Sequence, residues 1–126
     1  MINPLQTIPE RITQLTGITN AMVQKAPTFR NIASLLYHML QNTVFVAHNV
    51  NFDFPFLNHE LKEIGYPILK IKAIDTVTMS QILLPTLPSY QLRRISGYFN
   101  IVHKHPHSAS SDALATAYLL ILLIDR

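Results

Sequence analysis

The chain has 126 residues, the size of one domain, with 48% hydrophobic and 13% charged residues, a composition that excludes an intrinsically disordered chain. It contains no cysteine, which excludes disulfides and thiolate metal sites, so a metal would have to bind through oxygen or imidazole. The formal net charge of +3 is compatible with a polyanionic partner and also with an ordinary basic globular domain.

Helical signals dominate the first third of the chain. Pro9 and Gly17 suit the start and the end of a short helix at about residues 10–15. Thr19 is expected to cap a second helical turn. From about 28 to 41 apolar residues recur at helical spacing, which predicts an amphipathic helix.

The middle of the chain alternates between strand and helix signals. Residues 44–47 are fully apolar and rich in β-branched side chains, which predicts a buried parallel strand. Residues 53–65 carry an apolar face and end in glycine, which predicts a helix. Residues 71–77 are a second strand candidate, followed by a helix up to about residue 84.

The C-terminal third predicts two more helices. Ser89 is expected to cap the first, and Ser110 or Ser111 the second, which places Asp112 in its first turn. The apolar run at 113–124 is shorter than the ~20 residues that span a bilayer, so we expect a helix buried on several sides. With no signal-peptide pattern either, we expect no membrane partner and a cytoplasmic location.

This order of elements predicts an α/β fold with a parallel sheet. Only two strands are visible, and two strands make a poor parallel sheet when helices cover both faces. The pattern therefore predicts that strands of the complete fold are absent from this chain.

Asp53 and Asp112 are the candidate catalytic carboxylates. Both stand near the start of an expected helix, where carboxylates from distant parts of a chain can converge. Two-metal hydrolysis of a phosphodiester needs several such groups, and hard oxygen ligands suit Mg²⁺ or Mn²⁺. The alternative is that each aspartate only stabilises the first turn of its helix.

Two motifs surround these aspartates. Residues 46–57 contain Val-Ala-His-Asn, then Phe-Asp and Phe-Leu, and residues 107–112 place a histidine five positions before an aspartate. Together they resemble motifs II and III of the DEDDh (DnaQ-like, proofreading-type) 3′–5′ exonucleases. The resemblance extends over essentially the whole chain. It is strongest to the exonuclease domain of Gram-positive replicative DNA polymerases or of DinG-type helicases.

The resemblance implies a ribonuclease H-like exonuclease fold, but motif I, an Asp-x-Glu pair on an N-terminal strand, occurs nowhere in the sequence. We therefore expect 1–126 to be a partial exonuclease domain that lacks its first strands, with residues 2–4 as the tail of one of them. Loss of the central strand would leave 44–47 with an open edge. A homodimer or an exchange of elements between two copies could cover that edge.

The family's roles transfer to particular residues here. Asp53 and Asp112 would be metal ligands, and His107 the general base, since imidazole titrates near neutrality. A zinc site formed by His103, His105 and His107 is the alternative for these histidines.

Other residues would face the substrate. His48 and Asn49 would stand beside the cleft, and Thr16 would line the pocket for the terminal nucleotide. Phe52 could stack on a base, although a place in the core is the alternative. Asp75 is interpreted as structural.

Arg93 and Arg94 could contact phosphate, but we favour a solvated helix face for them.

The implied function is hydrolysis of 3′-terminal phosphodiesters of single-stranded or frayed DNA, in replication or repair and within a larger polymerase or helicase. With motif I missing, we expect the chain alone to be inactive or nearly so. The alternatives are a non-catalytic nucleic-acid-binding or interaction module and an RNA-directed exoribonuclease relative.

Overall fold

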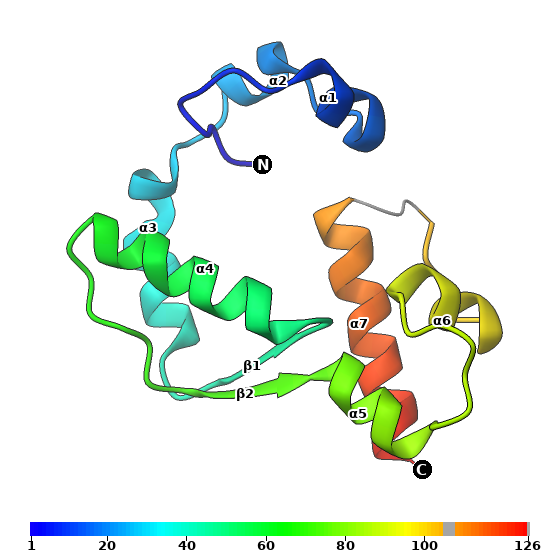
Figure 1. The fold of residues 1–126 in the computed structure, drawn as a ribbon. Coiled ribbons are helices and arrows are strands. Elements are labelled where there is room, and N and C mark those ends of the chain that lie inside the picture. Colours follow the sequence, from blue (N-terminus) through cyan, green and yellow to red (C-terminus); the bar gives the residue numbers. More distant parts are fainter. Residues whose placement is uncertain (105–107, 126) are drawn as a thin grey trace.

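The structure, a computed structural model, describes residues 1–104 and 108–125. Among these residues it contains helices around one small sheet (Figure 1). In chain order the elements are α1 (Glu10–Thr16), α2 (Asn20–Gln24), α3 (Phe29–Leu40), β1 (Val44–Ala47), α4 (Val50–Glu63), β2 (Lys72–Asp75), α5 (Thr76–Leu83), α6 (Leu92–Tyr98) and α7 (Ala109–Ile124).

The N-terminal helices begin and end where local capping predicts. Gly17 ends α1 in the left-handed conformation, with φ 77°, and Thr19 accepts a hydrogen bond from the Met22 N–H at the start of α2. Thr28 caps α3 in the same way. Asn3, expected as the tail of a strand, instead forms a single parallel bridge with Thr28.

The sheet consists of β1 and β2, paired in parallel with Val44 opposite Lys72 and Ala47 opposite Asp75. Both predicted strands are therefore present, but β1 is not the buried strand that the sequence predicted, because Val44 is exposed and only Ala47 is buried. Within the described part of the chain β1 has no second strand partner, so one of its edges is unpaired. α4 packs on both strands, and α7 lies beside β1.

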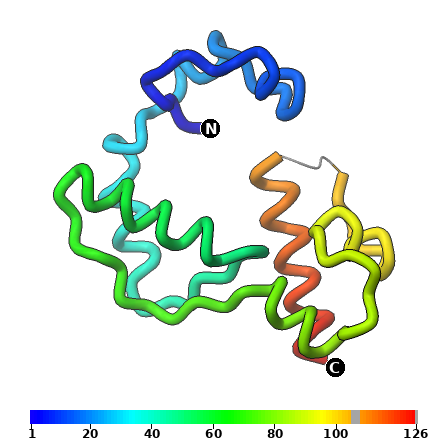
Figure 2. Tube along the Cα trace, in the orientation of Figure 1, coloured from blue at the N-terminus to red at the C-terminus, as the bar shows by residue number. Residues whose placement is uncertain are grey.

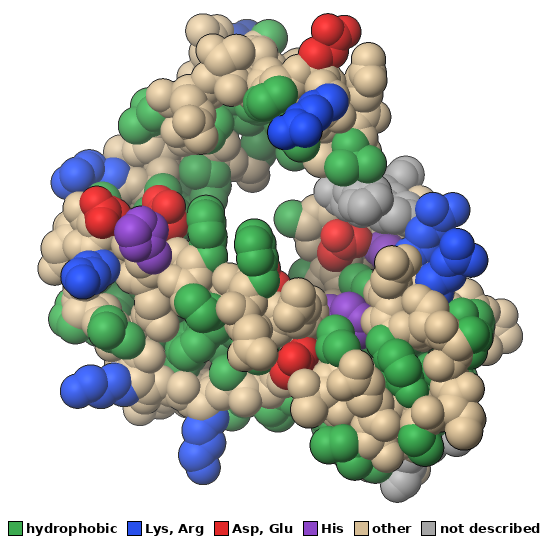
Figure 3. Space-filling model, viewed as in Figure 1, with side chains coloured by type: hydrophobic (Ala, Val, Ile, Leu, Met, Phe, Trp, Pro, Cys, Tyr) green, Lys and Arg blue, Asp and Glu red, His purple; other side chains and the backbone are tan. Residues whose placement is uncertain are grey.

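The elements form an open arch (Figures 1 and 2). α3 and α4 lie on one side, α5, α6 and α7 on the other, and the sheet connects the two sides. Each side has its own apolar cluster, one around Leu61 and Leu69 and the other around Ile95, Leu119 and Leu123. The space-filling view shows apolar side chains facing the opening of the arch (Figure 3).

Some boundaries and burial patterns differ from the sequence predictions. α4 begins at Val50 and not at Asp53, because Asn49, with φ 82°, turns the chain directly into the helix. Ser89 does not cap α6, and its hydroxyl accepts instead from the Gln91 N–H at 3.3 Å. α7 begins after Ser108, so neither Ser110 nor Ser111 is its cap.

Asp112 does lie in the first turn of α7, as predicted. The helix is not buried on all sides, because its outer stripe, Leu114, Tyr118 and Ile121, is about half exposed. None of the helices in the described ranges is long and apolar enough to cross a membrane.

Candidate active site

Asp75 joins the carboxyl ends of the two strands. Its Oδ1 accepts the N–H of Asn49, which follows β1, at 2.9 Å, and the N–H of Val77 in α5 at 3.0 Å. Oδ2 accepts the Thr78 hydroxyl at 3.0 Å. Burial alone would raise the pKa of this carboxyl, but the hydrogen bonds that it accepts lower the pKa overall. Asp75 is thus the N-cap of α5, in line with the structural role expected from the sequence.

His48, the residue after β1, is fixed by both of its ring nitrogens. Nε2 lies 2.6 Å from the Tyr90 carbonyl oxygen, and Nδ1 lies 2.8 Å from the hydroxyl of the fully buried Thr76. Because a carbonyl can only accept, Nε2 carries a proton, and Nδ1 lies beside the Thr76 hydroxyl, which also donates to the Ala47 carbonyl at 3.3 Å. Burial lowers the pKa of His48, against smaller opposite effects of the Tyr90 bond and the Asp75 charge. The ring therefore connects β1 to α5 and to the segment before α6.

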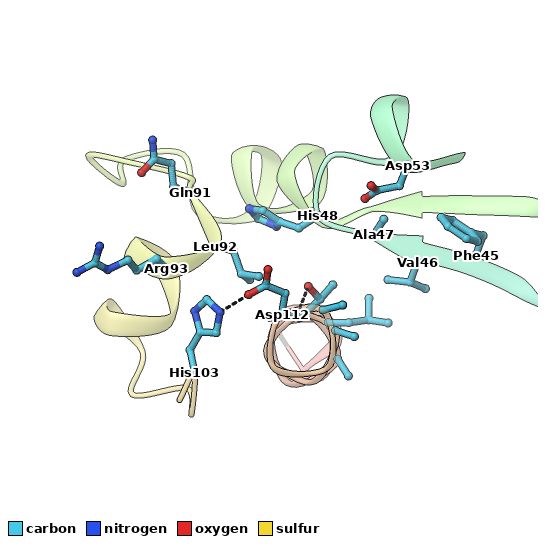
Figure 4. A pocket seen from close by; sticks show the side chains of 15 residues that line it. Phe45, Val46, Ala47, His48, Asp53, Gln91, Leu92, Arg93, His103 and Asp112 are labelled. Carbon is cyan, nitrogen blue, oxygen red and sulfur yellow. Dashed lines mark hydrogen bonds and ion pairs between the residues drawn. The ribbon is translucent and has the colours of Figure 1, made fainter. Parts of the chain in front are cut away.

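Asp53 and Asp112 line one pocket of ≈ 1050 Å³. Asp53 comes from the first turn of α4 and Asp112 from the first turn of α7, and both carboxylates point into the space beside β1 (Figure 4). The pocket walls are mostly apolar side chains of β1 and small side chains of α7, namely Phe45, Val46, Ala47, Ala109, Ala113, Thr116, Ala117 and Leu120. The structure therefore brings the two predicted carboxylates together.

The two carboxylates have different surroundings. Asp53 lies in the first turn of α4, as the simpler interpretation expects, although no side-chain cap bond is formed at the start of this helix. Burial raises the pKa of Asp53, which means that its charge is not compensated by the folded chain.

Asp112 is paired with His103. His103 Nε2 lies 2.5 Å from Asp112 Oδ1, and the His103 side chain is only 7% exposed, against 39% for Asp112 (Figure 4). Since a carboxylate accepts, His103 Nε2 donates to Asp112. His103 Nδ1 is buried and has no hydrogen-bond partner among residues 1–104 and 108–125. The pair fixes one oxygen of Asp112 and anchors the segment before α7.

His103 is the functional candidate that the sequence did not single out. It was considered only as part of a zinc-binding histidine set. Its contact with Asp112 spans a loop between α6 and α7, and no helical or strand periodicity relates two residues placed in that way. His107, the predicted base, and His105 lie outside the described residues.

His48 also lines this pocket, whereas Thr16, Asn49 and Phe52 do not. Thr16 ends α1, where its hydroxyl donates to the Ile12 carbonyl at 2.9 Å. Phe52 is 67% exposed and stacks on Phe56, with 6.2 Å between ring centroids. The core position considered for Phe52 is therefore wrong, and its ring is available at the surface. Asn49 acts through its backbone: its left-handed conformation turns the chain from β1 into α4.

The described residues do not complete a cation site by themselves. They bring two carboxylates to one pocket, but residues 1–104 and 108–125 contain no group of three or more His, Asp or Glu side chains able to hold a metal ion. The carboxylates in this pocket are Asp53 and Asp112, and Asp112 is already paired with His103.

Comparison with known proteins identifies the family. A sequence model of the RNase_T family, described as exonuclease, matches residues 1–120. The chain belongs to the RNase_T exonuclease family. The predicted exonuclease resemblance is thereby confirmed.

Named relatives agree with this assignment. The chain is 36% identical over 125 residues to the 3′-5′ exonuclease DinG of Bacillus subtilis. The match covers 99% of this chain and 13% of that protein. It is also 36% identical over 126 residues to the 3′-5′ exonuclease DinG of Staphylococcus aureus strain USA300, of which it covers 14%. The chain thus spans a small part of the length of these relatives.

A solved structure, Exonuclease X in complex with 5′ overhanging duplex DNA, superposes with a TM-score of 0.77. The match covers 99% of this chain and 70% of that chain at 24% sequence identity. It confirms the exonuclease, ribonuclease H-like fold, here with a two-stranded parallel sheet.

The His103–Asp112 pair is expected to contribute measurably to stability. His103→Ala removes a buried hydrogen bond to a charged group and should lower the free energy of unfolding by about 1–3 kcal/mol in urea denaturation. His103→Gln retains an N–H donor and should lose less. The control is His59→Ala, because His59 pairs with Glu63 at 3.8 Å with both side chains 64% exposed, so its loss should be close to zero. Equal losses for His103→Ala and His59→Ala would contradict this assignment.

Asp53 and Asp75 are expected to affect stability in opposite directions. The fold lowers the pKa of Asp75, so its stabilisation is present above the unfolded pKa and is lost as the pH falls through the folded pKa. The fold raises the pKa of Asp53, so its ionised form costs stability at neutral pH and the cost disappears on acidification.

Asp53→Asn should therefore raise the urea midpoint at neutral pH, and Asp75→Asn should lower it. Both differences should shrink as the pH falls below the ordinary carboxyl pKa of ~3.9. If both variants shifted the urea midpoint in the same direction at neutral pH, the pKa directions given for Asp53 and Asp75 would be wrong.

Proposed function

We propose that this chain supplies the Asp53 and Asp112 part of a metal-dependent 3′–5′ exonuclease site acting on the 3′ end of DNA. The observation that carries the proposal is the convergence of these carboxylates, from two separate helices, in one pocket of a chain that belongs to an exonuclease family. Relatives that share 36% identity over the whole chain are named 3′-5′ exonucleases.

In this proposal Asp53 and Asp112 hold Mg²⁺ or Mn²⁺ together with ligands from outside the described residues. Bound divalent cations would polarise the phosphoryl oxygen and activate water. The uncompensated charge of Asp53 favours a cation there, because a cation would remove the cost of its burial. His103 restrains Asp112 through Oδ1 and leaves Oδ2 for another partner.

The other predicted residues keep proposed roles around the reaction. His107 is the proposed general base, since its spacing to Asp112 matches motif III of the DEDDh exonucleases. Phe52 offers an exposed ring on which a base can stack. His48, with both ring nitrogens engaged, acts by holding the pocket wall in place, and Asn49 by turning the chain into α4. Thr16 keeps its role in the terminal-nucleotide pocket by family resemblance.

We also propose that residues 1–126 are a partial exonuclease domain and that this polypeptide alone has little or no activity. The affinity of a cation site depends on how many charged ligands it has, and the described residues provide only two carboxylates.

The direct test is to complete the carboxylate set. A chimera would place before Met1 a strand segment with the Asp-x-Glu pair that the DEDDh resemblance implies. With Mn²⁺ it should release 5′-mononucleotides from the 3′ end of 5′-labelled DNA, whereas the chain alone should not. Asp112→Asn and Asp53→Asn in the chimera should each lower the rate at least ~100-fold, as for the loss of an essential electrostatic contact.

Three results would count against the proposal: activity of the chain alone, a folded chimera without activity, or a chimera that keeps its rate in the Asp112→Asn variant. Matched RNA and DNA oligomers, compared in the same assay, separate a DNA exonuclease from an exoribonuclease. A folded chimera that binds DNA without cleaving it would favour the non-catalytic module.

The unpaired edge of β1 leads to a proposal about assembly. Exposed backbone donors and acceptors on a strand edge favour pairing with another chain, so we propose that two copies associate or exchange elements there. Light scattering should show dimers at high protein concentration. A proline at Phe45 or Val46 of β1 should reduce them if the folded state is retained in circular dichroism. A monodisperse monomer at high concentration would contradict this proposal.

A further inference from the structure

α6 carries a concave surface outside the candidate active site. Arg93, Arg94, Gly97 and Tyr98 line a hollow of ≈ 380 Å³. Gly97 borders open space, because a Cβ built on this residue would meet no atom within 4 Å. Tyr98 is 42% exposed, so part of its ring faces solvent. The four residues are called the α6 hollow below.

The two arginines of the hollow have no acidic partner in the described part of the chain, and neither takes part in a hydrogen bond or ion pair there. The acidic residues of the sequence after Asp75 are Asp112, which is paired with His103, and Asp125. Both guanidinium groups are therefore free to bind an anion.

The hollow borders the candidate active site at one residue, Arg93. Arg93 lines both the hollow and the pocket that holds Asp53 and Asp112. In the close view Arg93 extends from α6 away from the carboxylates, beyond Gln91 and Leu92 at the pocket rim (Figure 4). A ligand whose end lies at the carboxylates could thus continue across Arg93 onto α6.

We propose that the α6 hollow binds the backbone of a nucleic-acid single strand just upstream of its 3′-terminal nucleotide. Guanidinium groups bind phosphate oxygens in a bidentate manner, and an exposed tyrosine can stack on a base. Beside a pocket proposed to hold the 3′ end, the two arginines can bind successive phosphates of a single strand and the tyrosine ring can stack on one of its bases. The inference rests on the proposed function, since it takes the 3′ end to lie at Asp53 and Asp112.

The test measures binding without catalysis. A 5′-fluorescent single-stranded DNA oligomer is titrated with the chain at low salt in EDTA, and the dissociation constant follows from fluorescence anisotropy. Arg93→Gln combined with Arg94→Gln should weaken binding roughly 10-fold or more, and should make the dependence of log Kd on log salt shallower by about 1–2.

The matched control is Lys62→Gln combined with Lys70→Gln, which removes the same charge from exposed positions in α4 and the segment after it. We expect the control to change affinity less than about twofold, as for surface charges away from the contact. Equal weakening by the two pairs, or no weakening by the arginine pair, would overturn the inference, because the hollow would then be an ordinary solvated helix face.

Tyr98 provides a separate readout. Tyr98→Ala should weaken binding roughly fivefold or more, and Tyr98→Phe should restore it, because stacking needs the ring and not the hydroxyl. Unchanged unfolding midpoints show that the folded state is intact. Equal affinities of the wild type and Tyr98→Ala would remove the stacking part of the inference.

Because these titrations use EDTA, they do not depend on the metal site. If the double arginine variant loses DNA binding and the chimera is inactive, the inference about the α6 hollow is supported and the exonuclease proposal is rejected. If the chimera is active and the double arginine variant binds DNA as well as the wild type, the exonuclease proposal is supported and the inference about the α6 hollow is rejected. An RNA oligomer of the same sequence, titrated in parallel, shows whether the hollow distinguishes the two sugars.

Discussion

The positions of Asp53 and His48 depend on how the carboxyl ends of β1 and β2 are joined. The Asp75 carboxylate accepts hydrogen bonds from the N–H groups of Asn49, which follows β1 and precedes α4, and of Val77 in α5. The helices α4 and α5 therefore leave the sheet from a common point. His48 extends the same connection to Tyr90, before α6. A small parallel sheet has few backbone hydrogen bonds of its own, so these side-chain bonds determine where α4, α5 and α6 begin. The direction of α4 then places Asp53.

The far wall of the pocket is set by a second polar contact. His103 holds Asp112 at the start of α7, and α7 in turn packs beside β1. The two carboxylates therefore belong to separately anchored helices, and the apolar clusters on the two sides of the arch stabilise those helices independently. Such a site has its geometry fixed before any cation binds, which lowers the cost of assembling it. Burial raises the pKa of the Asp53 carboxyl in this site.

The sequence predicted the parts of this structure that depend on local patterns. The apolar run of β1, the helical periodicity of α3 and the capping threonines Thr19 and Thr28 each produced the expected element, and the motif spacing brought Asp53 and Asp112 to one pocket. Sequence-based prediction failed where several nearby residues could begin a helix. The expected caps Ser89, Ser110 and Ser111 are not used, and α6 and α7 begin after Gln91 and Ser108 instead. It also missed contacts without a periodic signature, above all His103 with Asp112, and it allowed a core position for the exposed Phe52.

The central claim is that this chain carries half of the charge of an exonuclease metal site. Isothermal titration of Mn²⁺ into the chain, the Asp112→Ala variant and the chimera with the Asp-x-Glu segment tests it most directly. We predict no resolvable binding to the chain or to the variant, and binding to the chimera that Asp112→Ala abolishes. Tight binding to the chain alone that Asp112→Ala abolishes would contradict the account, because a complete cation site would then exist without further carboxylates.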